Sequence, residues 1–427
     1  SLHDALPISQ NAPVDKSGEP ILYPIPETFE KAENDGQRWR FHLEAAKKSN
    51  PKLINSVDYN FASFLLSQWG VATLGNEWAS KFDDKKEKSI YALETVSDNE
   101  ALCKLATGVK RFKFPEGYDY IKIFKSIANS EDISFKRSAT DQLGQIYENR
   151  RQYAKAAAIW QTALKAGWDN KHYQYKINQI IGNWGQFEKV QPQLAGENAT
   201  FQFRFRNASK VEFTAYKIKI SELLNDLTLK IKTSKKIDWH EMNINQLGYR
   251  LVNSDKEKYA SEVFKSWEEK LLPRPDHFDE LVNLNTPFSD SGAYLIRSKV
   301  ENGNENYIVV FLSETTIVRK SLDKKALIYI ADSKTGAPLA NITVELFGYR
   351  YEYSKNENKL VTQQFALNTN ENGMIISDRI ENNNGTNWLI TARGENRFAY
   401  YGFQNFWANS FHEQKYYNRK TYGITDQ

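Results

Sequence analysis

The hydrophobic period of the chain changes near residue 196, and this change divides the protein into two kinds of structure. Between residues 27 and 190, apolar residues recur at three- and four-residue spacings, which is typical of amphipathic helices. Further along, Phe201, Phe203 and Phe205 alternate with polar residues, the pattern of a strand buried on one face. At 427 residues the chain is also too long for a single core. The sequence therefore predicts a multidomain α plus β protein, helical first and antiparallel β afterwards.

The helical region contains a match to the tetratricopeptide repeat, in which two antiparallel helices pack through small and large aromatic residues at fixed positions. The matching residues are Leu143, Gly144, Tyr147, Ala156, Trp160 and Ala163. The preceding segment fits the repeat with a turn about two residues longer, and its matching residues are Leu105, Ala106, Val109, Tyr120 and Phe124. Such repeats bury their apolar faces only against stacked neighbours. Residues 27–195 are therefore predicted to form one tetratricopeptide-like helical domain.

The region after the helices is predicted to begin with an antiparallel β-sandwich over residues 196–322, of the immunoglobulin-like kind. Strands are expected at 211–220, 292–297, 307–312 and 316–318. The segment 257–270 has a helical pattern and is expected to interrupt these strands. The first sandwich should thus carry a helical insertion.

A second, truncated β domain is expected over residues 323–427. Its first strand is predicted at Ala326–Ile330, and Thr343–Phe347 is predicted to return from a turn over 333–339 and complete a hairpin. The turn is indicated by Gly336, which permits positive φ, and by Pro338, which stops a helix.

Charge, cysteine content and apolar runs exclude several classes of partner and site. Lys plus Arg number 57 against 53 Asp plus Glu, and the charges are interspersed, so nucleic acid is not an expected partner. The single cysteine, Cys103, permits neither an internal disulfide nor a cysteine-based metal site. No apolar run reaches the roughly 18 residues that span a bilayer, and no signal peptide pattern is found.

The opening string Ser1-Leu-His-Asp-Ala-Leu-Pro-Ile-Ser9 lacks an initiator Met and resembles translated sequencing-adapter sequence. Residues 1–26 are therefore expected to be a non-native or disordered segment. A native signal peptide would then be lost with the true N-terminus, so its absence excludes no compartment.

Several phrases resemble the N-terminal part of bacterial α2-macroglobulin-family proteins. They are Gln179-Ile-Ile-Gly-Asn-Trp-Gly-Gln-Phe187, Phe203-Arg-Phe-Arg-Asn207, Gly292-Ala-Tyr-Leu295, Leu312-Ser-Glu-Thr-Thr-Ile-Val-Arg-Lys320 and Thr335-Gly-Ala-Pro-Leu-Ala-Asn-Ile-Thr-Val344. The resemblance implies that both β domains are macroglobulin-like. It also implies a periplasmic, cell-envelope or extracellular location, and endopeptidases as partners through downstream regions of the full protein.

Many members of that family carry an internal thioester between Cys and Gln in a Cys-x-Glu-Gln motif. Here Cys103 is followed by Lys104, Leu105 and Ala106, so the thioester motif is absent from this sequence. Because Cys103 lies in an apolar stretch of a predicted helical repeat, it is expected to be a buried structural thiol rather than a nucleophile.

Other patterns for chemistry are weak. No spacing suited to a shared metal is found among His3, His42, His172, His240, His277 and His412. The segment 182–185 lacks the Lys and Ser or Thr of a phosphate loop and is expected to end a helix, with Trp184 packed beneath the turn. The aromatic stretch 398–403 with Phe406-Trp407 is predicted to be core or interdomain packing, with a sugar-stacking face as the alternative. No catalytic, metal or cofactor-binding residue is predicted.

The leading hypothesis is therefore a non-catalytic N-terminal scaffold fragment of an α2-macroglobulin-like broad-range endopeptidase inhibitor that traps proteases. The alternative is a periplasmic or surface scaffold that binds a protein or glycan through the helical repeats and sandwiches. An enzyme is the third hypothesis, and it would require a cleft with converging titratable groups.

Overall fold

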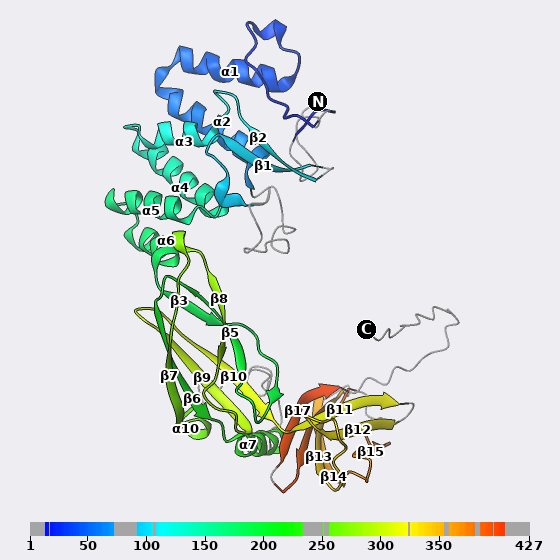
Figure 1. The fold of residues 1–427 in the computed structure, drawn as a ribbon. Helices are drawn as coiled ribbons and strands as arrows, with labels where there is room; N and C mark the ends of the chain where they lie inside the picture. Colours follow the sequence, from blue (N-terminus) through cyan, green and yellow to red (C-terminus); the bar gives the residue numbers. More distant parts are fainter. Residues whose placement is uncertain are drawn as a thin grey trace, which may run out of the picture. The chain divides into compact units, whose positions relative to one another are not determined.

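The computed structural model describes residues 13–16, 18–71, 92–105, 108–233, 251, 256–322, 325–353, 358–380, 385–395 and 397–405. Their contacts divide the chain into two units (Figure 1). The helical unit comprises residues up to Gly182 together with Pro273–Asp279, and the β unit comprises Asn183–Leu272 and the residues from Glu280 onward. The chain is thus an α plus β protein with several antiparallel sheets, as the change of period predicts.

The helical unit is built from α-helices, most of which begin at a capping side chain. They are α1 (Asp35–Ser49), α2 (Ile54–Trp69), α3 (Tyr120–Ala128), α4 (Ile133–Asn149), α5 (Tyr153–Lys165) and α6 (Asn170–Ile181). Four of them start after a side chain that accepts a hydrogen bond from a backbone N–H of the first turn, namely Asn34, Asp119, Asp132 and Asp169. Short 3-10 helices are η2 (Phe29–Lys31), η3 (Pro51–Leu53), η6 (Leu93–Thr95) and η9 (Pro275–His277).

The pair α4–α5 contains all six residues that match the tetratricopeptide pattern, and all six are buried. A Cβ at Gly144 would lie 2.3 Å from the Trp160 ring, so the helices approach as closely as they do only because this residue is glycine. The Trp160 indole donates to Glu148 at 2.7 Å. Its ring also stacks on Tyr173 of α6 with centroids 5.9 Å apart, so one aromatic residue ties three helices together.

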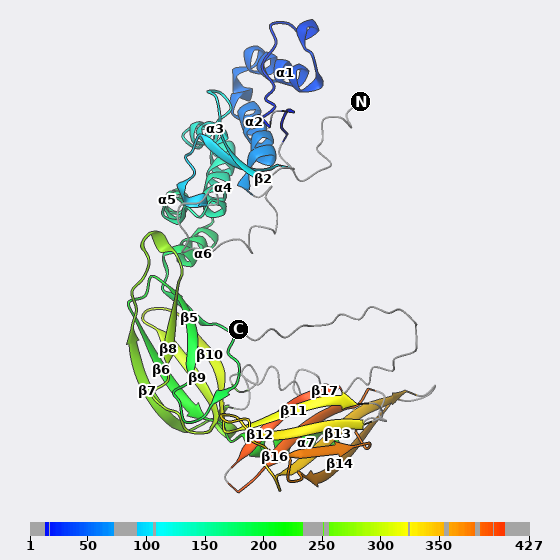
Figure 2. The same cartoon turned by 45° about the vertical axis from the view of Figure 1, so that its right-hand side comes forward.

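Between α2 and α3 the chain forms an antiparallel hairpin, β1 (Glu100–Leu105) and β2 (Gly108–Lys113), which lies against the helices (Figure 2). The prediction that this segment is the first helix of a degenerate repeat is wrong. Phe112 and Phe114 alternate around an intervening lysine with the two-residue period of a strand. Both rings pack edge-on against Trp69 of α2, with centroids 5.6 and 6.0 Å away, so a distant helix stabilises the strand that this local pattern favours.

The described part of the first 26 residues also contacts the helical unit. The Tyr118 hydroxyl donates to the Tyr23 carbonyl at 2.9 Å, and Lys110 pairs with Glu19 at 2.6 Å. Val14 packs against the helical core. The expectation of disorder is therefore wrong for these residues, because they bring apolar and hydrogen-bonding groups to the helices.

Two sheets form the first sandwich of the β unit, in the strand orders β4-β10-β9-β6-β7 and β3-β5-β8. The strands are β3 (Trp184–Phe187), β4 (Gln193–Leu194), β5 (Thr200–Arg206), β6 (Lys210–Lys217), β7 (Val263–Lys270), β8 (Glu280–Asn285), β9 (Gly292–Val300) and β10 (Glu305–Ser313). Phe201, Phe203 and Phe205 point into the shared core, which confirms the strand predicted from their alternation.

The helical insertion lies elsewhere than predicted. It is α7 (Ile220–Thr233), whereas the segment expected to be helical contains only the short α10 (Lys256–Tyr259) followed by β7. The Lys- and Glu-rich sequence of β7 favours a helix, but pairing with β6 along the sheet overrides this local preference. β3 and β4 also belong to this sandwich, although residues 184–194 were predicted to lie in the helical domain.

A second sandwich is formed by the sheets β11-β12-β15 and β14-β13-β16-β17. Its strands are β11 (Thr315–Leu322), β12 (Lys325–Asp332), β13 (Thr343–Tyr353), β14 (Asn358–Asn368), β15 (Met374–Ser377), β16 (Asn387–Arg393) and β17 (Phe398–Asn405). β11 pairs with β12, so it belongs to this sandwich and not to the first one, where the predicted boundary after residue 322 placed it.

The predicted hairpin between 326–330 and 343–347 is also wrong. The turn is tight, because Gly336 has φ +71° and Asp332 accepts from the N–H groups of Lys334 and Thr335. The chain then crosses to the opposite sheet, since β12 pairs with β11 and β15 whereas β13 pairs with β14 and β16. The crossing lets the apolar rows of β12 and β13 face each other in one core.

Helix α7 joins the two sandwiches within the β unit (Figure 1). Its apolar residues follow the spacing of a single helical stripe, and the buried ones are Leu223, Leu224, Leu227 and Ile231. They cluster with Ala293 and Leu295 of β9 and with Phe347 and Tyr349 of β13. Alternate residues of the same strands face the sandwich cores, so both faces of these strands are buried.

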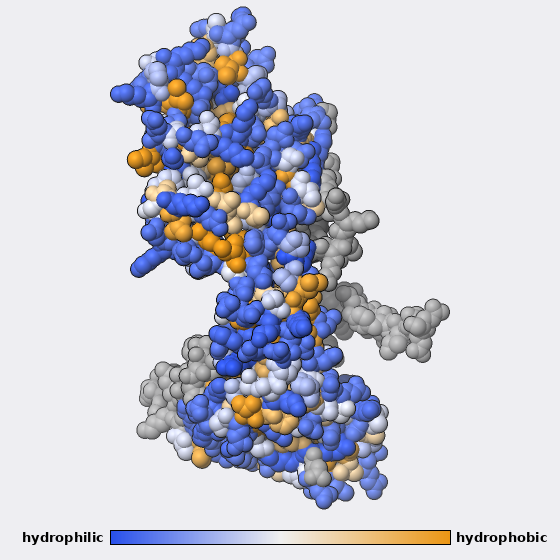
Figure 3. Space-filling view, turned by 60° about the vertical axis from the view of Figure 1, so that its left-hand side comes forward, coloured by the Kyte–Doolittle hydropathy of each residue, from blue (hydrophilic) through white to orange (hydrophobic). Residues whose placement is uncertain are grey.

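None of the helices that the structure describes combines the length and apolar character needed to cross a bilayer. On the face drawn in Figure 3, hydrophilic residues predominate and hydrophobic residues form only small patches.

Candidate functional site

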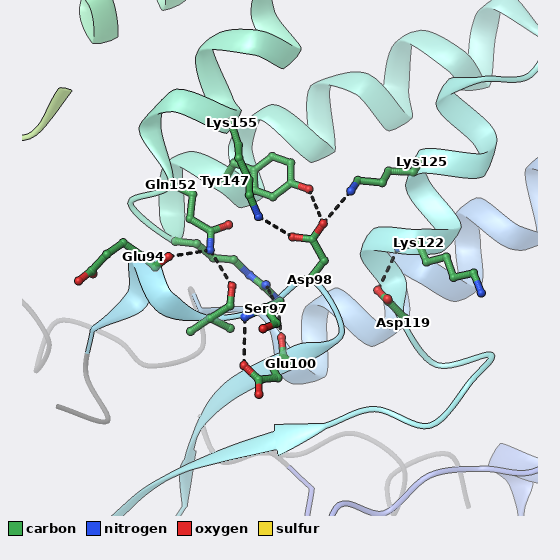
Figure 4. A network of polar contacts seen from close by, with 12 residues as sticks. Glu94, Ser97, Asp98, Glu100, Asp119, Lys122, Lys125, Tyr147, Gln152 and Lys155 are labelled. Carbon is green, nitrogen blue, oxygen red and sulfur yellow. Dashed lines mark hydrogen bonds and ion pairs between the residues drawn. The ribbon is translucent and has the colours of Figure 1, made fainter. Parts of the chain in front are cut away.

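Titratable side chains converge at Asp98, in the segment that precedes the β1–β2 hairpin (Figure 4). Its carboxylate accepts from Lys125 of α3 at 2.6 Å, from Lys155 of α5 at 3.0 Å and from the Tyr147 hydroxyl of α4 at 3.1 Å. Burial acts to raise the pKa of Asp98, but the hydrogen bonds from the two ammonium groups lower it to about 2. Burial raises the pKa of Tyr147. The carboxylate is thus a fixed anion and not a proton-transfer group.

Two neighbouring side chains hold the backbone of the same segment. The buried Arg150 guanidinium donates to the carbonyls of Ser97 at 2.9 Å and Glu100 at 2.7 Å, and to the Tyr120 hydroxyl at 2.7 Å. The Gln152 amide donates to the carbonyl of Val96 at 2.6 Å (Figure 4). These donors are engaged with main-chain acceptors. We therefore assign a structural role to this cluster: it anchors residues 92–100 on three helices.

The β unit contains an open cleft of about 1810 Å³. It is walled by the segment 187–194, by β10 from Asn306 to Ser313, by the start of β11 and by residues 394–402 around β17. Both sandwiches therefore contribute to it. Its floor near α7 includes Ile218 and Ile220, so the cleft adjoins the apolar cluster that joins the sandwiches.

The lining of this cleft combines charged, polar and apolar side chains with strand edges. Among its described residues there is no histidine or cysteine, and Glu188 is paired with Arg204 at 2.7 Å. Arg397 is held by Asp332 at 3.0 Å and by the Glu314 carbonyl at 2.8 Å. The remaining surface includes strand edges, amide and hydroxyl side chains, the charged Lys189, Lys217 and Glu395, and partly buried aromatic rings such as Tyr400. Burial raises the pKa of the Tyr400 hydroxyl, which keeps it protonated.

The residues singled out for chemistry in the sequence do not come together. Cys103 lies in β1 rather than in a helix, which corrects the prediction, and its side chain lies outside the described residues. His42 and His172 pack beside aromatic rings, His277 lies in η9, and His3, His240 and His412 are outside the described residues. Within the described ranges, no group of three His, Cys, Asp or Glu side chains is placed to hold a metal ion.

The segment 182–185 ends α6 as predicted, with Gly182 at the C-cap in an extended conformation. Trp184 is only partly buried, and it begins β3. The aromatic stretch 398–403 forms β17: Phe398, Tyr400 and Phe403 pack against the α7 cluster, and Tyr401 packs against the core of the second sandwich. This placement matches the prediction of packing between domains, while Phe406-Trp407 lies outside the described residues.

The cleft and α7 were missed by sequence reasoning. The apolar spacing of residues 223, 224, 227 and 231 is a helical signal that was available in the sequence. The cleft had no such signal, because its walls come from segments far apart along the chain.

Comparisons with known proteins can be set beside this geometry. No protein-family model matches the chain, and no curated protein matches it. Among solved structures, the chain is similar to native alpha-2-macroglobulin from Escherichia coli spanning domains NIE-MG1, with 16% identity and a TM-score of 0.36 over 52% of this chain and 97% of that one. For the same protein spanning MG0-NIE-MG1, identity is 15% and the TM-score 0.34, over 52% of this chain and 64% of that one.

A third similar structure is Salmonella alpha-2-macroglobulin reacted with methylamine, with 8% identity and a TM-score of 0.21. The match covers 53% of this chain and 17% of that one. The chain therefore spans less than two thirds of the length of two of these three structures.

Proposed function

We propose that this chain is an N-terminal scaffold part of an α2-macroglobulin-like broad-range endopeptidase inhibitor. In this proposal the helices form a tetratricopeptide-like domain, and the two sandwiches are macroglobulin-like domains. The observation that carries it is the serial arrangement of the β unit, in which two sandwiches have separate cores and share an apolar joint at α7. The phrase 312–320, which resembles the family, runs from β10 of the first sandwich into β11 of the second.

The proposal assigns this chain no chemical step. A protease trap needs a large assembly that rearranges after cleavage, and separately folded modules with limited joints permit such movement. Endopeptidases would be engaged by downstream regions of the full protein, without a cofactor or nucleic acid. The protein would act in the periplasm or at the cell envelope.

The test uses the full-length protein encoded by the source gene, incubated with several unrelated endopeptidases. Trapping predicts that a bound protease loses activity on large protein substrates but keeps activity on a short chromogenic peptide. It also predicts compaction on native gels after cleavage. The 427-residue chain alone should leave the proteases uninhibited. Full activity of every protease on large substrates, without compaction, would contradict the proposal.

The open cleft of the β unit favours a second candidate, a scaffold that binds a partner protein. This function needs no protease and no cleavage-triggered change. Capture of a partner by the intact chain, lost when the cleft is altered, would support it, whereas saccharide binding through aromatic residues of the cleft would indicate a glycan partner instead.

A further inference from the structure

The outer edge of β10 has main-chain groups without a described partner. The Val300 N–H donates to the Asn304 carbonyl, and this pair sets which residues of the hairpin exchange hydrogen bonds. In an antiparallel pair such residues alternate, so the even-numbered residues of β10 bond to β9. The N–H and C=O groups of Tyr307, Val309 and Phe311 therefore point to the opposite edge, and no described residue bonds to them.

β17 has an equivalent edge. It is the last strand of its sheet, and the Gly394 N–H donates to the Arg397 carbonyl. By the same alternation, Ala399 and Tyr401 of β17 bond to β16, before the register shift at Trp388–Ile390. The main-chain groups of Phe398 and Tyr400 are thus directed away from β16 and have no described partner.

The outer edges of β10 and β17 line the same cleft, and both strands pack against the same apolar cluster. Side chains of β10 and β17 pack against the α7 cluster, and the rings of Phe311 and Tyr400 meet with centroids 5.4 Å apart. The two strands belong to different sheets and are not paired with each other, while the ring contact shows that they lie near each other.

The protein's own chain already uses part of this edge. β4 pairs in parallel with Leu312 and Ser313, and the Ala195 N–H donates to the Ser313 carbonyl at 3.2 Å. Residues 188–192 line the cleft without pairing to β10, and Pro192 has no N–H to offer. The edge of β10 therefore accepts an extended strand at one end, and none of the described residues pairs with it along the rest.

We propose that this cleft binds an extended polypeptide segment, which adds as a strand between β10 and β17. Recognition would come from main-chain hydrogen bonds to the two edges. Alternate side chains of the segment would face the α7 cluster and should be apolar, whereas those between them would face the cleft opening and should be polar. The inference goes beyond the proposed inhibitor scaffold and does not depend on it, because any partner with a free extended segment would satisfy it.

The experiment uses the intact chain and a fluorescein-labelled peptide of about nine residues, in which Val and Thr alternate between terminal lysines. Fluorescence anisotropy gives its affinity. A second peptide of the same sequence carries N-methyl groups on alternate amides, which removes the donors of one edge. We expect the N-methyl peptide to bind about tenfold more weakly or worse, because two or three net hydrogen bonds are lost.

A proline variant provides the matching change in the protein. Val309→Pro removes an N–H that β9 does not use and should weaken peptide binding about tenfold. Ser266→Pro is the control: Ser266 lies on the outer edge of β7, whose odd-numbered residues bond to β6, and affinity should be unchanged.

Equal affinity for the two peptides, or absence of binding at millimolar peptide, would overturn the proposal. So would unchanged binding in Val309→Pro. If that variant fails to fold, the comparison of the two peptides on the unaltered chain still decides. Hydrogen exchange adds a local readout, because the bound peptide should protect the amides of residues 307, 309 and 311.

Discussion

The helical unit and the β unit each hold one extra element against their main framework, and they do so with different chemistry. In the helical unit, residues 92–100 are fixed to α3, α4 and α5 by hydrogen bonds and ion pairs from Asp98, Arg150 and Gln152. In the β unit, α7 is fixed between two sandwiches mainly by buried apolar side chains. One attachment depends on donor and acceptor geometry, and the other depends on buried area.

This difference has consequences for specificity and for response to conditions. Apolar burial contributes in proportion to area and tolerates several packing arrangements, so a joint such as α7 can be strong without being unique. A buried polar group must meet its partner or lose stability, so the contacts of Arg150 permit one placement of the segment. The polar attachment is held by charged groups, whereas the buried contacts of α7 are apolar and its Asp226 pairs with Lys258 at the surface.

The largest loss of stability is expected from shortening a buried side chain at the apolar joint. Leu227 is 1% exposed, whereas Leu229 of the same helix is 60% exposed. Leu227→Ala should lower the free energy of unfolding of the β unit by about 2–5 kcal/mol, because it leaves a cavity, and Leu229→Ala should cost well under about 1 kcal/mol. Hydrogen exchange of the α7 and β9 amides measures both values. Similar losses for the two variants would show that α7 is not held by its apolar stripe.

A somewhat smaller effect is expected from removing the main polar anchor. Arg150→Met keeps much of the side-chain volume but leaves two carbonyls and a hydroxyl without their donor. We expect a loss of about 2–4 kcal/mol, seen as faster hydrogen exchange of the β1–β2 amides. Lys136→Met, a change at a half-buried position of the helix that Arg150 caps, is the control. Unchanged protection of the hairpin in Arg150→Met would mean that apolar packing against Trp69 suffices.

Different parts of the fold also differ in how far the sequence predicts them. Local signals were sufficient for β5, where three phenylalanines alternate, and for α4–α5, where small and aromatic residues recur at fixed positions. They failed for β7, because pairing with β6 decides its structure, and for the 333–342 connection, because a tight turn does not determine which sheet the chain enters next.

The candidate sites were less predictable still. Asp98 meets Lys125, Tyr147 and Lys155, which are 27, 49 and 57 residues away along the chain. The cleft combines strand edges from both sandwiches, and such an edge is recognised only because no described strand pairs with it. No local spacing of residues indicates either the Asp98 contacts or the cleft edges, so only the assembled fold identifies them.

The smallest and most selective effect concerns pH. The pKa of Asp98 is lowered from 3.8 to about 2, so the folded state holds fewer protons on this group than the unfolded state between those values. Its stabilisation is therefore complete above about pH 4 and is lost as the pH falls through about 2. We expect this stabilisation to be about 1–2 kcal/mol, less than the full shift implies because Asp98 is partly exposed.

Asp98→Asn should remove this contribution, so the difference in hairpin protection between variant and parent should shrink from pH 7 toward pH 2. Leu227→Ala should show an almost constant difference over the same range, since the substitution removes only apolar contacts. A difference for Asp98→Asn that does not vary with pH would mean that the carboxylate is held by shape and hydrogen bonding alone, and the contrast between the two attachments would then rest on geometry and not on charge.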